Sequence, residues 1–210
     1  ITAISDELAS MSQNDVWDLV ELLDECEHVG CKWVFKTKRD SRGEVERYKA
    51  RLVAKGYKKR DGIDYRETFS PVSTKDSFRI IMALVAHFDL ELRQMDVKTA
   101  FQNGNLVEDV YMEQPEGFKV SGKEHLVFKL RKSIYGLKQS SRLWYLKFDE
   151  VITSSSFKKN DGDQCIYLKI SGSSFIFLVL YVDGILLASN DAALLNETKQ
   201  LLSTRFDMQD

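Results

Sequence analysis

The feature that most limits how this chain can fold is a pair of apolar segments, residues 175–181 and 185–188, separated by Val182, Asp183 and Gly184. Neither segment approaches the roughly 20 apolar residues that a membrane-spanning helix needs. An Asp-Gly pair between apolar strands is among the strongest local signals for a β-hairpin. We therefore predict two buried antiparallel strands with an acid at their tip.

A second hairpin is predicted at residues 32–55, where two strands flank the turn signal Asp40-Ser41-Arg42-Gly43. In the second strand every other residue is a cation: Arg47, Lys49, Arg51. Strand alternation puts these cations on one face, about 6.6 Å apart, which is close to the spacing of successive phosphates. The residues between them are expected to point toward a core: Tyr48, Ala50, Leu52.

Charge is distributed unevenly along the chain. The net charge is −2, yet residues 1–31 carry only acids, and residues 32–60 are strongly basic. Such block asymmetry favours a polyanionic partner on one face. The alternative is a solvated face on a charged sheet.

The remaining segments predict a mixed fold. Helical spacing indicates helices at residues 75–88, 137–154 and 192–205, the first beginning at Ser73-Thr74-Lys75-Asp76. Strands are predicted at residues 90–97, 165–170, 175–181 and 185–189, and residues 103–124 form a polar stretch punctuated by glycine. The pattern indicates an α+β fold around an antiparallel sheet rather than a parallel βαβ fold.

Three short segments hold residues suited to chemistry. Asp96 ends an apolar strand, Tyr135-Gly136 precedes a polar and aromatic helix, and Asp183 lies between two apolar strands. Taken singly, these are explained by a helix cap, a turn and a hairpin tip. Local structure alone is a poorer explanation for the occurrence of all three segments in this order after a basic hairpin.

The chain resembles the reverse transcriptase of copia-type LTR retrotransposons, from about Trp17 to the end. The resemblance is carried by long ungapped segments: Cys31-Lys32-Trp33-Val34-Phe35-Lys36, Arg47-Tyr48-Lys49-Ala50-Arg51-Leu52-Val53-Ala54-Lys55-Gly56, Glu67-Thr68-Phe69-Ser70-Pro71-Val72, residues 95–101, Val110-Tyr111-Met112-Glu113-Gln114-Pro115-Glu116-Gly117-Phe118, residues 135–139 and residues 180–183. It implies an RNA-directed DNA polymerase with a right-hand fold, in which packed helices cover an antiparallel palm sheet.

The resemblance also implies the chemistry. Asp96 and Asp183 would be catalytic carboxylates, and they would hold two magnesium ions (or manganese) together with the backbone carbonyl of Val97. Phosphoryl transfer leaves the protein mainly positioning and charge neutralisation to do.

Six further residues resemble the family's nucleotide-binding positions. They are Lys49, Arg51, Phe101, Gly136, Lys138 and Gln139. The two cations would hold the incoming triphosphate, and the last three would contact template and nucleotide. The Phe101 ring would exclude a 2′-hydroxyl, the alternative being an ordinary core aromatic.

Two departures from the family pattern stand out. Gly184 occupies the position of a second hairpin aspartate, and Ser140-Ser141 replaces Ala-Pro. The first departure removes a carboxylate. It leaves a second hypothesis, a catalytically silent relic that still folds and binds nucleic acid. A third hypothesis is a small structural domain whose motifs are only hairpins and caps.

By resemblance, the fingers would comprise residues 1–86, with an acidic lead-in at 1–31 and the basic hairpin at 32–56, and residues 118–140. The palm would comprise residues 87–117 and 141–210, and thumb and ribonuclease H would be absent. Expected partners are an RNA template, a DNA primer, deoxynucleoside triphosphates and the rest of a Pol polyprotein, with integrase upstream and ribonuclease H downstream. No membrane partner is expected, and the expected location is a cytoplasmic virus-like particle.

Overall fold

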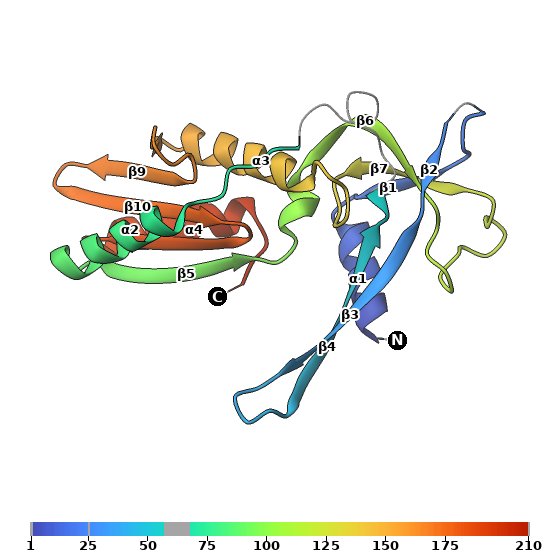
Figure 1. Cartoon of the computed structure of the whole chain (residues 1–210), viewed down its shortest axis with the longest axis horizontal. Coiled ribbons are helices and arrows are strands. Elements are labelled where there is room, and N and C mark those ends of the chain that lie inside the picture. Colours follow the sequence, from blue (N-terminus) through green and yellow to red (C-terminus); the bar gives the residue numbers. More distant parts are fainter. Residues whose placement is uncertain (1, 25, 57–67, 210) are drawn as a thin grey trace. The chain divides into compact units, whose positions relative to one another are not determined.

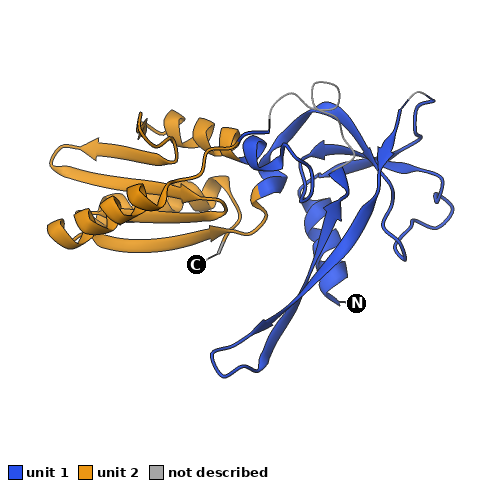
Figure 2. Ribbon diagram, viewed as in Figure 1, with its two compact units in different colours: residues 1–69, 101–144 blue, residues 70–100, 145–210 orange. Residues whose placement is uncertain are grey.

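The computed structural model describes residues 2–24, 26–56 and 68–209 (Figure 1). These residues belong to two compact units (Figure 2). Unit 1 comprises Ile1–Phe69 and Phe101–Trp144, and unit 2 comprises Ser70–Ala100 and Tyr145–Asp210. Each unit has its own sheet, and each is described below by itself.

Unit 1 combines a four-stranded sheet, a separate two-stranded hairpin and a helix. In spatial order the sheet strands are β1 (Trp17–Val20), β7 (Val127–Lys132), β6 (Asn105–Met112) and β2 (His28–Val29). The hairpin is β3 (Cys31–Arg39) with β4 (Val45–Ala54). Helix α1 (Thr2–Gln13) precedes the first strand, and the short helix η2 (Ala100–Asn103) precedes β6.

The core of unit 1 joins α1, the four-stranded sheet and the base of the hairpin. Its buried apolar residues come from α1 (Met11), from both hairpin strands (Cys31, Leu52, Ala54) and from β6 and β7 (Val110, Met112, Phe128, Leu130). The base of the hairpin is therefore anchored in the core. Its tip is not, since Phe35 and Tyr48 are exposed.

Unit 2 is built on a six-stranded sheet in which every described pairing is antiparallel. In spatial order its strands are β12 (Met208–Gln209), β5 (Glu91–Val97), β11 (Gly184–Ser189), β10 (Ser174–Tyr181), β9 (Ile166–Ser171) and β8 (Lys158–Lys159). Its helices are α2 (Lys75–Phe88), α4 (Ala192–Arg205) and most of α3 (Ser140–Ser154).

Helices cover both faces of this sheet. On one face Ile81 of α2 packs against Ile166 and Val179. On the other, Phe148 of α3 meets Tyr167 edge-on at 5.9 Å between ring centroids, and α4 contacts β10 and β11. Alternation along the strands gives each face its own apolar set.

Most of the predicted elements are present. Both hairpins, the helices near residues 75–88, 137–154 and 192–205 and the antiparallel sheet are confirmed. The prediction missed α1, β1 and β7, and it missed β6 within the polar stretch 103–124. Tyr48 was expected to point toward a core, but its side chain is 69% exposed, because the hairpin extends beyond the core of unit 1.

The bounds of the two units differ from the division made on the sequence. Residues 70–86 belong to unit 2, and residues 101–117 belong to unit 1. The assignment of fingers and palm stays a prediction. Among the described residues, no helix combines the length and the apolar character that a membrane span requires.

Candidate active site and nucleic-acid-binding surface

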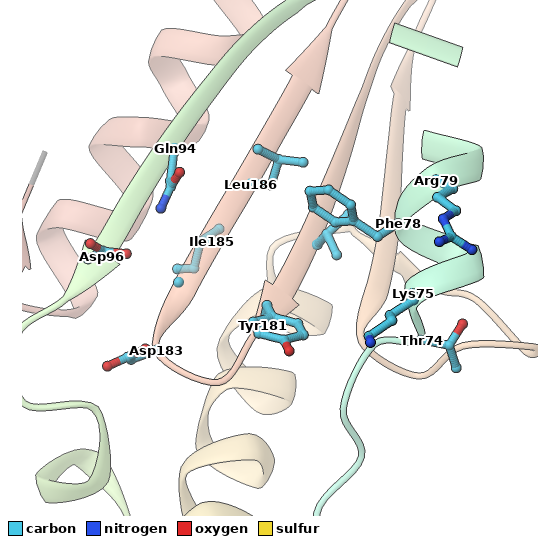
Figure 3. Close-up of a pocket in the computed structure, with 12 residues that line it drawn as sticks. Thr74, Lys75, Phe78, Arg79, Gln94, Asp96, Tyr181, Asp183, Ile185 and Leu186 are labelled. Carbon is cyan, nitrogen blue, oxygen red and sulfur yellow. The ribbon is translucent and has the colours of Figure 1, made fainter. Parts of the chain in front are cut away.

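The sheet of unit 2 brings Asp96 and Asp183 to the same end. Asp96 is the penultimate residue of β5 and lies opposite Gly184, the first residue of the neighbouring strand β11. The Val97 N–H donates a hydrogen bond of 2.9 Å to the Asp183 carbonyl, which ties the end of β5 to the hairpin tip. Figure 3 shows both carboxylates at this end of the sheet. Two acids separated by 87 positions in the sequence thus become neighbours on a shared sheet.

The turn between β10 and β11 differs from the expected Asp-Gly turn. Tyr181 pairs with Gly184, so the two loop residues are Val182 and Asp183. Val182 carries the positive φ of 59°, an unusual conformation for a β-branched residue. Gly184 lies within the strand and has no positive φ. Glycine is therefore not required there by backbone conformation.

The missing side chain of Gly184 faces Asp96. A Cβ added at position 184 would lie 3.3 Å from Asp96 Oδ1 and 3.5 Å from the Tyr181 carbonyl oxygen. The first contact is tight, and a small shift of the Asp96 carboxylate would relieve it. A carboxylate at position 184 would thus stand beside that of Asp96.

A cavity of about 530 Å³ opens at this end of the sheet, on the face that α2 covers. Asp96, Asp183 and Gly184 line one part of it, and Phe78, Val179 and Leu186 form an apolar wall. Figure 3 shows side chains of α2 opposite those of β10 and β11. The volume lies within the range of small-molecule and cofactor sites.

The donor set suits magnesium only in part. Magnesium prefers hard oxygen ligands, and Asp96 and Asp183 supply two carboxylates at adjacent strand ends. Within the described residues no group of three His, Cys, Asp or Glu side chains comes together. The residues therefore fit a metal site with few protein ligands, completed by substrate and water oxygens.

The start of α2 is held by a buried acid from the loop before β9. Asp163 accepts hydrogen bonds of 3.0 Å from the Ser73 hydroxyl, the Thr74 N–H and the Cys165 N–H. Burial by itself would raise the pKa of Asp163, but these hydrogen bonds and one from Ser77 lower it overall. The helix is capped by Thr74, not by Ser73.

In unit 1 the hairpin gathers cations on one face. Residues that are direct partners across the two strands point to the same side. The register pairs Lys36 with Lys49 and Lys38 with Arg47. Like charges opposite each other are destabilising, and a polyanion bound to this face would relieve the repulsion.

Lys49 and Arg51 are half-buried near Glu7 of α1. Burial is the main cause that lowers the pKa of Lys49. The nearby Arg51 lowers it further, and Glu7 acts in the opposite direction. Burial also raises the pKa of Glu7, although the Leu52 N–H and the two cations act against this. One acid therefore lies near two cations, so their positive charge is only partly compensated.

Arg51 and Phe101 meet at one aromatic ring. The Arg51 guanidinium carbon lies 4.7 Å from the centre of the Tyr135 ring. The Phe101 ring meets the same ring edge-on at 4.7 Å between centroids. Tyr135 therefore orients two of the six candidate nucleotide-binding residues, a role that the sequence alone did not indicate.

Gly136 lies where no side chain fits. It has φ +93°, and a Cβ would lie 2.0 Å from the Ala54 carbonyl oxygen. The Ala54 N–H donates a 2.8 Å hydrogen bond to the Tyr135 carbonyl, so β4 and this turn pack backbone to backbone. Close packing explains the glycine without a ligand.

Lys138 is exposed, whereas Gln139 is 6% exposed. The structure thus places all six candidate nucleotide-binding residues in unit 1 and the metal-binding candidates in unit 2. Sequence reasoning missed Glu7, Tyr135 and Asp163. Glu7 and Asp163 carried no signal beyond their charge, and Tyr135 was read only as part of a turn.

Comparisons with known proteins show the family to which the chain belongs. A family model described as reverse transcriptase (RNA-dependent DNA polymerase) matches residues 14–210. The chain is 49% identical over 99% of its length to the retrovirus-related Pol polyprotein from transposon TNT 1-94 of Nicotiana tabacum. It is 42% identical, again over 99% of its length, to that from transposon RE1 of Arabidopsis thaliana.

The chain spans 16% and 14% of the length of these two relatives. Among solved structures, a telomerase from Candida albicans in complex with a fragment of telomeric RNA is similar at 13% identity and a TM-score of 0.44. That match covers 94% of this chain and 42% of the other.

Proposed function

The chain belongs to the reverse transcriptase (RNA-dependent DNA polymerase) family, and from this premise we propose that it extends a DNA primer with deoxynucleotides on an RNA or DNA template. The observation that supports this most directly is the pairing of Asp96 with the Asp183 hairpin at one end of a rigid sheet. Carboxylates held by neighbouring strands suit the positioning and charge neutralisation that phosphoryl transfer requires.

In this proposal Asp96, Asp183 and the Val97 carbonyl hold two magnesium ions, with manganese as a substitute. When bound, the metals would lower the pKa of the primer 3′-hydroxyl and stabilise the charge of the leaving pyrophosphate. The hydrogen bond from Val97 to Asp183 supports the role of the framework, because it limits how far the hairpin tip can move from β5.

Unit 1 supplies the groups proposed to bind the nucleotide and the template. Lys49 and Arg51 neutralise phosphate charge, and Phe101 limits the space at the sugar. Gly136, Lys138 and Gln139 form the segment that follows β7, where close backbone packing fixes the conformation. Burial of Gln139 favours a contact through its backbone over one through its side chain.

The finer architecture belongs to the same proposal. Fingers would comprise residues 1–86 and 118–140, and the palm residues 87–117 and 141–210. The remaining proposed partners are the other parts of a Pol polyprotein, namely integrase and ribonuclease H. The proposed location is a cytoplasmic virus-like particle of the element.

Magnesium-dependent primer extension tests the function. Asp96→Asn and Asp183→Asn keep side-chain size and remove one charge each, and each is expected to lower extension by about 10² or more. Asp161→Asn, an exposed acid in a loop of unit 2, is the matched control and is expected to have no effect. Equal activity of the two variants and the control, at equal thermal stability, would show that the carboxylate pair is not the catalytic centre.

A further inference from the structure

The cavity beside Asp96 and Asp183 is also lined by a cationic side chain, for which the metal-binding role proposed for the two carboxylates does not account. Lys75 and Arg79, both on the first turns of α2, are the two cations among its lining residues. Arg79 forms an ion pair of 3.1 Å with Asp76. In the part of the chain that the structure describes, no ion pair or hydrogen bond involves the Lys75 amine. Within the described residues, Lys75 is thus a cation without a hydrogen-bonded or ion-paired partner, in the cavity that holds the candidate catalytic acids.

The position of Lys75 is well defined at its backbone. The Thr74 side chain accepts a hydrogen bond from the Ser77 N–H, and the Thr74 N–H is held by the buried carboxylate of Asp163. Figure 3 shows the Lys75 side chain extending from α2 in the direction of Tyr181 on β10. The amine is therefore presented to the cavity from a fixed helix start.

The cavity links this cation to the candidate catalytic acids. Lys75, Asp96 and Asp183 all line the same space of about 530 Å³, so a nucleic-acid backbone that reaches the acids passes near Lys75. If Asp96 and Asp183 serve the primer 3′-hydroxyl, the last phosphodiesters of the primer pass through or beside this cavity. An ammonium group is a strongly hydrated point charge that suits a phosphate oxygen.

We propose that Lys75 binds one of the two phosphodiesters nearest the 3′ end of the primer and so positions the 3′-hydroxyl at Asp96 and Asp183. This rests on the proposed function. Lys75 is a positioning residue here, since it contacts the primer backbone and not the reacting atoms. Phosphates of the template strand share the same chemistry, and the experiment separates the two sources.

The test combines protein variants with neutral linkages in the nucleic acid. A methylphosphonate replaces one charged phosphate oxygen by a methyl group, so it removes the charge at a single chosen linkage. Binding of template–primer to the 210-residue chain is measured by fluorescence anisotropy at several salt concentrations, with methylphosphonate placed in turn at each terminal primer linkage and at the opposite template linkages.

For the unmodified chain, a methylphosphonate at one of the last two primer linkages is expected to weaken binding about three- to fivefold. Lys75→Ala should weaken binding to the unmodified duplex by a similar factor and make the salt slope shallower by about 0.7–0.9. The same neutral linkage should then cost Lys75→Ala no further affinity. Lys75→Arg should retain the sensitivity.

Lys158→Ala is the matched control, because it removes one exposed lysine at the far edge of the same sheet. It should leave the sensitivity to every linkage unchanged. Coupling of Lys75 to a template linkage, or to no linkage, overturns the proposal while leaving the polymerase function standing. Absence of any template–primer binding by the unmodified chain contradicts both. If Lys75→Ala does not fold, Lys75→Gln replaces it.

Discussion

The two hairpins of this chain are predicted by similar sequence patterns, but they differ in exposure and in what surrounds them. Among the described residues the β3–β4 hairpin of unit 1 pairs with no third strand, and it exposes Phe35 and Tyr48 among cations. The β10–β11 hairpin of unit 2 lies inside a six-stranded sheet, and residues such as Leu178 and Leu187 are fully buried. One hairpin presents a charged surface, and the other supports a single acid.

The turns of the two hairpins also differ in their hydrogen bonds and in which residue has a positive φ. In the β3–β4 turn, Asp40 Oδ1 accepts hydrogen bonds of 2.9 Å from two backbone N–H groups, and Gly43 takes the positive φ. In the β10–β11 turn, the positive φ falls on Val182 instead, next to Asp183. Strain beside a candidate catalytic residue persists only where surrounding structure holds it, as the sheet does here. Placement of a catalytic carboxylate requires a rigid support of this kind.

Among the variants that compare the two hairpins, the largest expected effect comes from Gly184→Asp, which would add a second acid to the β10–β11 hairpin. Loss of one preorganised charged group commonly lowers rates by about 10²–10³, so restoring one should raise magnesium-dependent primer extension at least about tenfold. The strand conformation at position 184 accepts aspartate without a positive φ. Thermal stability should change little with magnesium and fall without it, because the new carboxylate stands beside Asp96.

Gly184→Asn is the control, since it adds a side chain of the same size without charge. Robust extension by the glycine form, with no gain for the aspartate variant, would show that the second hairpin acid is dispensable. A gain shared by asparagine would assign the effect to packing and not to charge.

Phe101→Val tests whether unit 1 selects the sugar. Relief of a clash at the 2′ position should raise the acceptance of ribonucleotides relative to deoxynucleotides by about tenfold. Deoxynucleotide incorporation should fall only moderately. Phe101→Tyr keeps the ring against Tyr135 and should retain selection. Equal losses for both sugars, together with a lower melting temperature, would identify Phe101 as a core residue only.

Lys49→Ala combined with Arg51→Ala tests the exposed hairpin. Removing two phosphate contacts should make the slope of log K against log salt shallower by about 1.4–1.8. Glu7→Gln removes the acid near both cations and should strengthen binding instead. Filter binding over a range of salt concentrations measures both. An unchanged slope for the double variant would mean that this face does not contact nucleic acid.

The smallest effect concerns Asp163 and depends on pH. Its pKa is lowered in the folded chain, so its contribution to stability is present above the unfolded pKa and is lost as the pH falls through the folded pKa. Asp163→Asn should therefore lower the free energy of unfolding by about 1–2 kcal/mol at neutral pH. The difference from the unmodified chain should shrink below about pH 4.

Glu7 of unit 1 is the contrasting case, because its pKa is raised. The folded state binds its proton more tightly, so any stability it contributes is present below the unfolded pKa and is lost as the pH rises through the folded pKa. Denaturant titrations of Asp163→Asn and Glu7→Gln across pH should give differences of opposite sign. The same sign for both would mean that hydrogen bonding at Asp163 and burial at Glu7 do not govern these two acids.

The helices and hairpins could be predicted because the residue patterns that indicate them span only a few residues. Helix α2 appears at the residues that helical spacing predicts, and β3–β4 and β10–β11 follow the predicted alternation. The missed strands β1 and β7 pair with each other across more than a hundred residues, and no local pattern reports such a pairing. The exposure of Tyr48 could not be predicted from the sequence either. Alternation shows which face of a strand a side chain lies on, but not whether another element packs against that face.

By itself the sequence determined the family, the two hairpins and the identity of Asp96 and Asp183 as acids at strand ends. Tertiary structure decided that these acids become neighbours, that Val182 carries the positive φ and that Gly184 faces Asp96. It also decided that Lys75 shares a cavity with both acids and that Arg51 and Phe101 meet at Tyr135. The physical reason is that propensity and periodicity act over a few residues, whereas strand register and helix placement depend on burial of the whole core.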